Sequence, residues 1–195
     1  RREKDRLNAT GTTHGGIECI NGRWYVFYHR LTHASDYSRQ ACAEPIKINT
    51  DGSIDQVEIS SSGLSAKPLS VIACSITNGR MPHISNSRYG GKIPMITDRG
   101  GERFIADIDR RTTVSYKRFG FESNEGDIIL DVDSRARGKI SVFADGVKIA
   151  QAAVPRSGRS KVSLSYKVSE KTEQALSIKF SGKGYFDLYS IEFKE

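Results

Sequence analysis

The sequence predicts an all-β protein, and three observations lead to this fold class. Its ordered segments alternate between apolar and polar residues, or are rich in β-branched residues, which is typical of strands. Asn-Gly and Asp-Gly pairs, at residues 21–22 and 145–146, separate such segments. These pairs favour two-residue hairpins, because both central residues of a type I′ turn take positive φ. Finally, no window of a dozen residues holds an apolar stripe of helical period.

The strand candidates follow in chain order. The first hairpin joins residues 17–20 to 23–28, and a longer loop at 49–52 separates 45–48 from 53–59. The other predicted strands are residues 71–76, 103–107, 113–119, 126–132, 139–144, 147–151, 161–168, 175–180 and 185–193.

A change of composition divides the chain. Residues 60–68 are small and polar without periodicity, which indicates a linker or a long surface connection. The part before them has about four strands, the size of one propeller blade. The part after them has about eight short strands, as in a β-sandwich or jelly roll. We therefore predict an incomplete propeller blade at residues 1–69 and a β-sandwich at residues 70–195.

Composition limits the class of protein. No stretch has the roughly 20 apolar residues that cross a bilayer, so no membrane partner is predicted. No apolar run follows the charged N-terminal residues, so no signal peptide is seen. The three cysteines lack C-x-x-C spacing, which favours buried free thiols over a disulfide framework or a zinc site.

The chain is basic, with a formal net charge of +7. The excess follows Leu69, where it forms small clusters at residues 110–111, 135–139 and 156–161. No nucleic-acid-binding motif accompanies these clusters, so nucleic acid and acidic glycans remain minor alternatives as partners.

The first segment carries a series of specific motifs. They are His14-Gly15, the hairpin Asn21-Gly22, Trp24-Tyr25 followed by Phe27-Tyr28-His29-Arg30, then Ser38-Arg39-Gln40 and Glu44-Pro45-Ile46. Together they resemble the last blade of the five-bladed β-propeller of glycoside hydrolase family 43. The resemblance implies the C-terminal part of a larger extracellular or periplasmic enzyme. Such an arabinofuranosidase- or xylosidase-like enzyme would act on plant polysaccharide containing arabinose, xylose or galactose.

The resemblance places no catalytic residue in this chain. Family 43 enzymes use a carboxylate base, a carboxylic acid and a third carboxylate that tunes the acid, and all three come from earlier blades. Asp36, Glu44 and Glu58 match none of these positions, and we interpret them as solvated or structural carboxylates.

Two residues of the blade are implied to face the active site. By resemblance, His14 points into the propeller axis and ligates, or lies one water from, a central metal ion, often calcium. Its alternative role is to cap a loop. Arg39 resembles an arginine that binds sugar hydroxyls or a catalytic carboxylate, for which a planar guanidinium is well suited. Its alternative is a salt bridge on the strand surface. The aromatic side chains of Trp24, Tyr25, Phe27 and Tyr28 are expected between blades, and stacking on sugar is their alternative role.

A single blade leaves apolar side chains facing water. The missing blades in another chain, the sandwich of this chain, or self-association could cover them.

The second segment resembles carbohydrate-binding module family 6, on residues 72–76 and 174–193. Such modules stack sugars on aromatic rings. The main candidates are Tyr89 and Tyr166, and Tyr116 and Tyr185 are further candidates. Asp187 resembles an aspartate that holds structural calcium, although the expected partner glutamate is absent near residues 71–76. A sugar-binding or scaffolding sandwich without catalysis is the alternative function.

Overall fold

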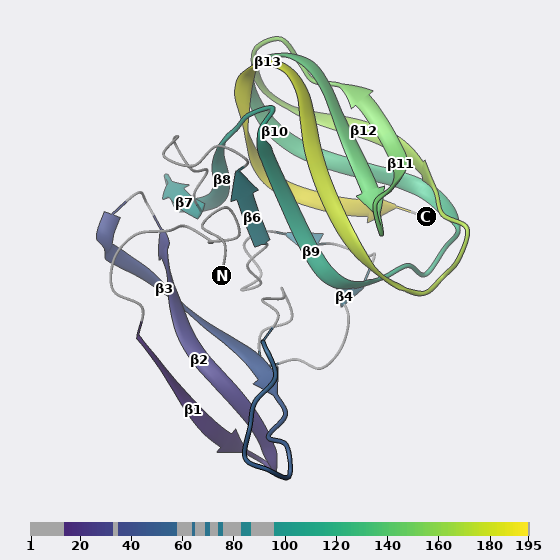
Figure 1. Ribbon diagram of the computed structural model, residues 1–195. Helices are drawn as coiled ribbons and strands as arrows, with labels where there is room; N and C mark the ends of the chain where they lie inside the picture. Colours follow the sequence, from purple (N-terminus) through teal and green to yellow (C-terminus); the bar gives the residue numbers. More distant parts are fainter. Residues whose placement is uncertain are drawn as a thin grey trace.

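The computed structural model describes residues 14–32, 35–57, 64, 69–70, 74–75, 83–86 and 96–194. These residues hold thirteen strands in two sheets and no helix, which confirms the all-β prediction (Figure 1). In this part of the chain no helix could therefore cross a membrane.

The first sheet is a three-stranded antiparallel meander. It consists of β1 (Gly15–Ile20), β2 (Arg23–Thr32) and β3 (Ser35–Ile46). Asn21 and Gly22 join β1 to β2 with φ of 51° and 77°, as the Asn-Gly pair predicts. Of the fourth strand expected at 53–59, the structure describes residues 53–57, where one bridge joins Ile54 to Ile48.

One face of this sheet exposes apolar side chains. Cys19 lies opposite Trp24, and Trp24 opposite Ile46, so these three residues share a face. Trp24 is 42% exposed, and Ile17, opposite Val26 on the same face, is 47% exposed. The expectation that an isolated blade leaves apolar residues in water is therefore confirmed.

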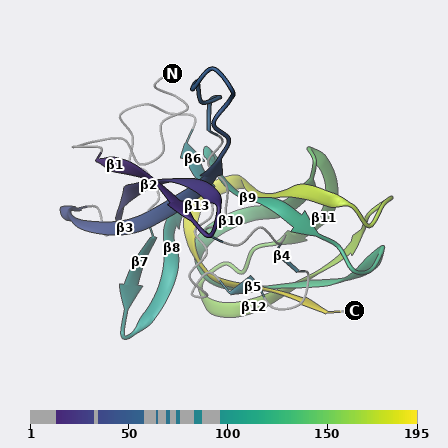
Figure 2. The same ribbon diagram turned by 90° about the horizontal axis from the view of Figure 1, so that it is seen from below.

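Two long strands form the spine of the second sheet. β10 (Glu125–Ala144) and β13 (Glu173–Lys194) pair antiparallel from Asp127 and Lys194 to Ala144 and Leu176. Both strands curve, and Figure 2 shows them wrapping round a common interior with their neighbours. The two halves of each strand thus serve two layers, which is the arrangement of a β-sandwich.

The other strands flank this spine. β12 (Gly158–Lys167) pairs with the first half of β10, and β11 (Val147–Ala153) with its second half. β9 (Thr112–Gly120) pairs with the first half of β13, and β8 (Glu102–Ile108) with its second half. The short strands are β7 (Ile96–Arg99) beside β8, β5 (Cys74–Ser75) beside β13, and β4 (Leu69–Ser70) and β6 (His83–Asn86) beside β9.

A single apolar core lies between the layers. Alternate residues of β10 point inward, among them Ile128, Leu130 and Val132, all with no exposed surface. Leu176 and Ile178 of β13 are equally buried. Full burial of such a side chain contributes roughly 1.5–3 kcal/mol, so the alternating pattern provides the main stabilisation of the sandwich.

Glycines form the bend in the spine. Gly138 lies opposite Gly182, and a Cβ on either residue would overlap the backbone of the partner strand. Gly184 has φ of 87°, and its Cβ would overlap the carbonyl oxygen of Arg135. Only glycine lets the two backbones approach this closely while they turn.

This bend explains one difference from the prediction. Residues 126–132 and 139–144 were expected as two strands, as were 175–180 and 185–193, yet each pair is one continuous strand. The glycines bend the backbone while its ladder of hydrogen bonds continues. Leu69 pairs with β9, so the second sheet starts one residue before the predicted boundary; the division at residues 69 and 70 stays a prediction.

The cysteines match the prediction only in part. Cys19 is a free thiol, as expected. Cys19 is exposed, however, because every residue of β1 faces solvent, so burial was the wrong expectation for this thiol.

Candidate functional site

His14 and Arg39 lie on the same face of the first sheet. The His14 ring meets the ring of His29 edge-on, with centroids 5.8 Å apart. His29 pairs with Ala41, and Arg39 is two residues further along β3, which places it on the same face. Both His14 and Arg39 are exposed. The register therefore brings together the two blade residues that the sequence singles out.

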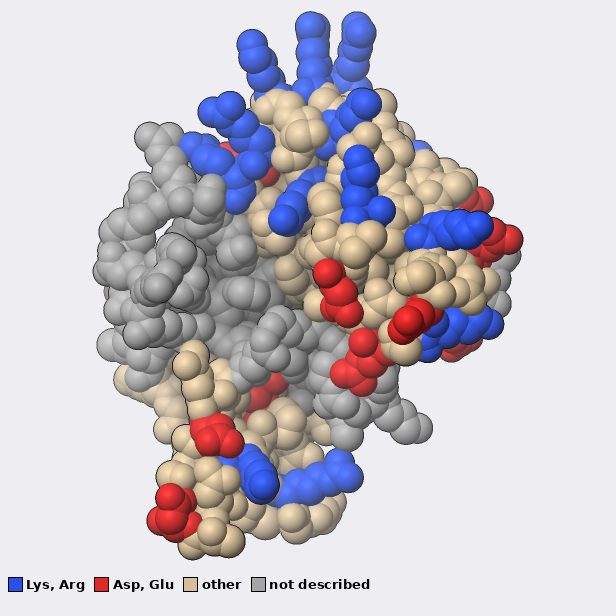
Figure 3. All heavy atoms as spheres, turned by 45° about the vertical axis from the view of Figure 1, so that its right-hand side comes forward, with Lys and Arg blue, Asp and Glu red and all other residues tan. Residues whose placement is uncertain are grey.

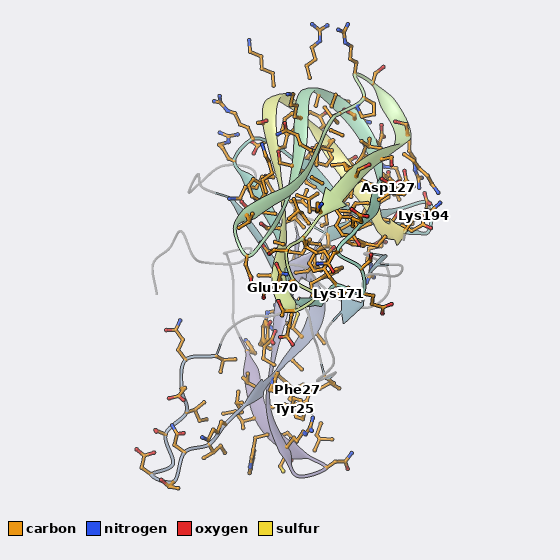
Figure 4. The ribbon with its side chains drawn as sticks, turned by 90° about the vertical axis from the view of Figure 1, so that its right-hand side faces the viewer. Tyr25, Phe27, Asp127, Glu170, Lys171 and Lys194 are labelled. Carbon is orange, nitrogen blue, oxygen red and sulfur yellow. The ribbon has the colours of Figure 1, made fainter. Side chains whose placement is uncertain are left out.

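The same face continues toward apolar residues. Tyr25 and Phe27 lie at alternate positions of β2 before His29, on the same face, and their rings are 6.4 Å apart (Figure 4). Tyr25 is buried, whereas Trp24 on the opposite face is not. The predicted role of these aromatics between blades stays a prediction.

Glu44 is a buried carboxylate rather than a solvated one. It is 2% exposed and accepts a hydrogen bond of 3.2 Å from the Tyr28 hydroxyl. This position supports the structural alternative given for Glu44. Glu58 and the side chain of Asp36 lie outside the described part of the chain.

Tyr166 cannot serve as a stacking surface in this structure. Its side chain is 3% exposed and packs against Phe121 and Phe193, with ring centroids 5.7 and 5.8 Å away. Tyr166 points inward because it belongs to the alternating buried face of β12, so the prediction that it binds sugar is wrong here. Tyr89 lies outside the described residues.

The other tyrosine candidates differ in exposure. Tyr116 is fully buried in the core, whereas Tyr185 is 38% exposed. The Arg135 guanidinium lies 5.7 Å from the centre of the Tyr185 ring. Of the three tyrosine candidates that the structure describes, Tyr185 is therefore the exposed one.

Asp187 has a structural position. Its Oδ1 accepts a hydrogen bond of 2.9 Å from the N–H of Asp107, a residue with φ of 55°. Its Oδ2 lies 3.7 Å from Arg135 Nη1. Burial raises the pKa of Asp187 above its ordinary value, against the opposing effects of the Asp107 amide and Arg135.

These contacts do not make Asp187 a complete cation site. Calcium takes six to eight oxygen ligands, and a guanidinium beside the carboxylate opposes a cation. In the described residues, no group of three His, Cys, Asp or Glu side chains gathers as a metal site. Calcium at His14 or Asp187 stays a prediction.

A hollow lies at the bend of the spine, where the sequence pointed to no site. It has a volume of about 330 Å³ and is lined by Asp109, Arg110, Arg111, Gly182, Lys183 and Gly184. The loop between β8 and β9 supplies the first three residues, and the bend of β13 supplies the others. The only sequence signal for this site was the basic pair Arg110-Arg111, and only the fold brings this pair to Lys183.

Asp109 is held firmly in the wall of the hollow. It accepts hydrogen bonds from the Arg111 N–H at 2.8 Å and from Arg111 Nε at 2.9 Å. Burial opposes its charge, but these bonds and that from Thr112 outweigh burial and lower the pKa of Asp109. Asp109 is therefore ionised at neutral pH and paired with Arg111.

Arg159 belongs to a separate network on β12. It donates hydrogen bonds to Glu102 and Asp131, and its guanidinium lies 4.0 Å from the centre of the Tyr189 ring. Hydrogen bonding from Arg159 lowers the pKa of Glu102. The charge of Arg159 is thus balanced by two carboxylates of the sandwich itself.

Comparisons with known proteins show what this chain is similar to. No protein-family model matches the sequence. Over 124 residues, 56% of this chain, it is 37% identical to a xylosidase/arabinosidase of Thermoclostridium stercorarium. The chain spans only about a quarter of that relative, since the match covers 26% of it.

Three solved structures share the fold. A family 43 arabinoxylan arabinofuranohydrolase from Bacillus subtilis matches 97% of this chain and 42% of its own, with a TM-score of 0.53 and 20% identity. A family 6 carbohydrate-binding module from Clostridium stercorarium matches 67% of this chain and 98% of its own, with a TM-score of 0.50 and 16% identity. The C-terminal family 6 module of a laminarinase from Zobellia galactanivorans matches 64% and 98%, with a TM-score of 0.52 and 16% identity. The chain therefore resembles, as its sequence motifs predicted, the C-terminal part of a family 43 glycoside hydrolase followed by a sandwich like the family 6 carbohydrate-binding modules.

Proposed function

We propose that this chain is part of a secreted family 43 glycoside hydrolase that acts on plant polysaccharide containing arabinose, xylose or galactose. The observation that carries the proposal is the 37% identity to a xylosidase/arabinosidase. Because the match covers a quarter of that relative, the hydrolytic activity is assigned to a longer protein of which this chain is one part.

The first sheet would contribute to the wall of the active site. His14 and Arg39 lie on one face of this sheet, so one surface could present both side chains to a sugar. The guanidinium of Arg39 suits hydroxyl or carboxylate oxygens. The catalytic carboxylates, and any calcium held near His14, would then depend on blades outside this chain.

The apolar face of the same sheet supports this arrangement. Trp24 and Ile17 are nearly half exposed, so covering the rest of each side chain would contribute about 1 kcal/mol, roughly half the value of full burial. Neighbouring blades are the proposed cover, and self-association is the alternative.

The sandwich would bind polysaccharide and keep the enzyme at its substrate. Its fold is that of family 6 carbohydrate-binding modules, and the match covers nearly the whole of those modules. We place the protein outside the cell or in the periplasm, where such substrates are found.

Hydrolysis separates the enzyme from a non-catalytic sugar-binding protein. The longer protein should release 4-nitrophenol from 4-nitrophenyl arabinofuranoside or 4-nitrophenyl xyloside, whereas the 195-residue chain alone should not. In the longer protein, Arg39→Ala should lower kcat/KM by at least about tenfold, the effect of roughly 1.4 kcal/mol. Arg23→Ala, an exposed arginine at the opposite end of the sheet, is the matched control.

Two results would overturn the proposal. An inactive longer protein that still binds arabinoxylan would favour the non-catalytic alternative. Hydrolysis by the 195-residue chain itself, abolished by Arg39→Ala, would show that the catalytic groups lie within it.

A further inference from the structure

The bend of the sandwich gathers cations from four separate segments of the chain. We call Arg110, Arg137, Lys139, Arg156 and Lys183 the basic tip. Arg110 and Lys183 line the same hollow, and Arg137 lies directly opposite Lys183 on the paired strands. All five side chains are exposed. The fold thus joins basic clusters that lie far apart in the sequence.

The connection between β11 and β12 brings the remaining member to this end. The N–H of Val154 donates a hydrogen bond of 3.0 Å to the carbonyl of Gly138, and Gly158 pairs with Ser134. Arg156, between these two anchors, therefore lies beside the bend. Figure 3 shows Lys and Arg side chains projecting from this end of the sandwich, at the top of the view.

The structure shows no ion pair between the basic tip and a carboxylate of the residues it describes. Neighbouring arginines have carboxylate partners: Arg111 binds Asp109, and Arg135 lies 3.3 Å from Asp133. By contrast, Arg110, Arg137 and Lys183 have no acidic partner among the residues that the structure describes. Like charges directly opposite on paired strands destabilise a sheet, so the pair of Arg137 and Lys183 opposes folding unless an anion lies between or beside them.

The hollow has the size and lining for a sugar-like anion. Its volume of about 330 Å³ is near the lower end of the roughly 300–1,000 Å³ of small-molecule sites. Gly182 and Gly184 leave backbone exposed at its surface, while Asp109 is already bonded to Arg111 and Thr112. Arg110 and Lys183 supply cations at the same place.

These groups favour one ligand chemistry over another. A carboxylate would meet the cations, with a guanidinium able to bind both of its oxygens, while hydroxyls would meet the backbone of the bend. Binding of single-stranded nucleic acid uses aromatic rings as stacking platforms, and none of the described residues that line this hollow is aromatic. A sugar acid fits the lining better than a nucleotide chain.

We propose that the hollow and the basic tip bind a uronic acid unit of an acidic polysaccharide. This inference rests on the proposed function in one respect, since it assumes that the sandwich meets polysaccharide. It adds a substrate feature, the carboxylate, and a location, the bend of β10 and β13.

Calorimetric titration of the 195-residue chain tests the inference. The probes are a xylo-oligosaccharide carrying one glucuronic acid and the same oligosaccharide without it. The acidic probe should bind at least about tenfold more tightly, and this advantage should shrink with added salt because exposed charges are screened. The double variant Arg110→Gln/Lys183→Gln should lose most of the advantage while the affinity for the neutral probe stays unchanged.

A control variant removes the same charge elsewhere. Lys171 and Lys194 are exposed and lie well away from the tip, as Figure 4 shows, so Lys171→Gln/Lys194→Gln should keep the preference. Equal urea midpoints for both double variants would show that neither is unfolded.

Three outcomes would overturn the inference. Equal affinity for the two probes would show that the sandwich does not recognise the carboxylate, and it would not bear on the proposed hydrolase activity. An equal loss of the preference for the acidic probe in the control variant would show that the preference depends only on net charge. Tighter binding of a single-stranded DNA oligonucleotide than of the acidic probe would assign the tip to nucleic acid. Conversely, failure of the hydrolysis test with the acid preference intact would overturn only the proposed enzyme.

Discussion

Replacing Gly184 with alanine should destabilise the sandwich far more than the same change at Gly146. Both glycines have positive φ, 87° and 82°, so both variants carry similar backbone strain of roughly 1–2 kcal/mol. A Cβ at Gly146 meets nothing within 4 Å, because this residue lies in an exposed hairpin turn. A Cβ at Gly184 overlaps the carbonyl oxygen of Arg135, which is backbone and cannot rotate away.

The two variants should differ in the free energy of unfolding that they lose, and this difference measures the cost of the overlap at Gly184. Forcing extra atoms into a packed site costs about 1–3 kcal/mol, so Gly184→Ala should lose about 2–5 kcal/mol in total, and Gly146→Ala only the strain of about 1–2 kcal/mol. Urea unfolding should be followed by far-ultraviolet circular dichroism. Fluorescence is unsuitable because the single tryptophan, Trp24, lies in the first sheet. Losses that agree within about 0.5 kcal/mol would refute the role assigned to the glycine bend.

Other substitutions test individual groups. Asp187→Asn keeps an acceptor for the Asp107 amide and should be near neutral, whereas Asp187→Ala should cost about 1–3 kcal/mol in urea unfolding. Because burial raises the pKa of Asp187, its charge opposes folding above that pKa; the opposition should fade as pH falls through it, and Asp187→Asn should abolish this pH dependence. Cys19 should react with a thiol reagent faster than the half-buried Cys42, as mass spectrometry after brief labelling would show. Acrylamide should quench Trp24 strongly in this chain and weakly in the longer protein, and equal quenching would mean that no blade covers that face.

The turns were the most predictable part of the fold. Asn21-Gly22 and Asp145-Gly146 both adopt positive φ at their two residues, because local sequence decides this geometry. Strands β8, β9 and β12 also lie where alternation placed them, to within three residues. Alternation could not show that β10 and β13 continue through their glycines, because pairing between strands far apart in sequence maintains them.

The candidate site was less predictable for the same reason. His14 and Arg39 were singled out by resemblance, and the register then placed them on one face. Tyr166 was misjudged because an aromatic residue in an alternating strand faces inward or outward according to its parity alone. The hollow at the bend joins residues 109–111 to 182–184, and no local pattern reveals such a contact.

The shared spine has a consequence for how the sandwich forms and fails. Since β10 and β13 run through both layers, neither layer has a complete set of strands without the other. The pairing that creates them joins positions such as Lys139 and Ser181, 42 residues apart. Loop closure over such separations is slow, so refolding should be limited by the meeting of these two strands. Once they have met, both layers should melt in a single step, and amide hydrogens on either side of the bend should exchange through the same global opening.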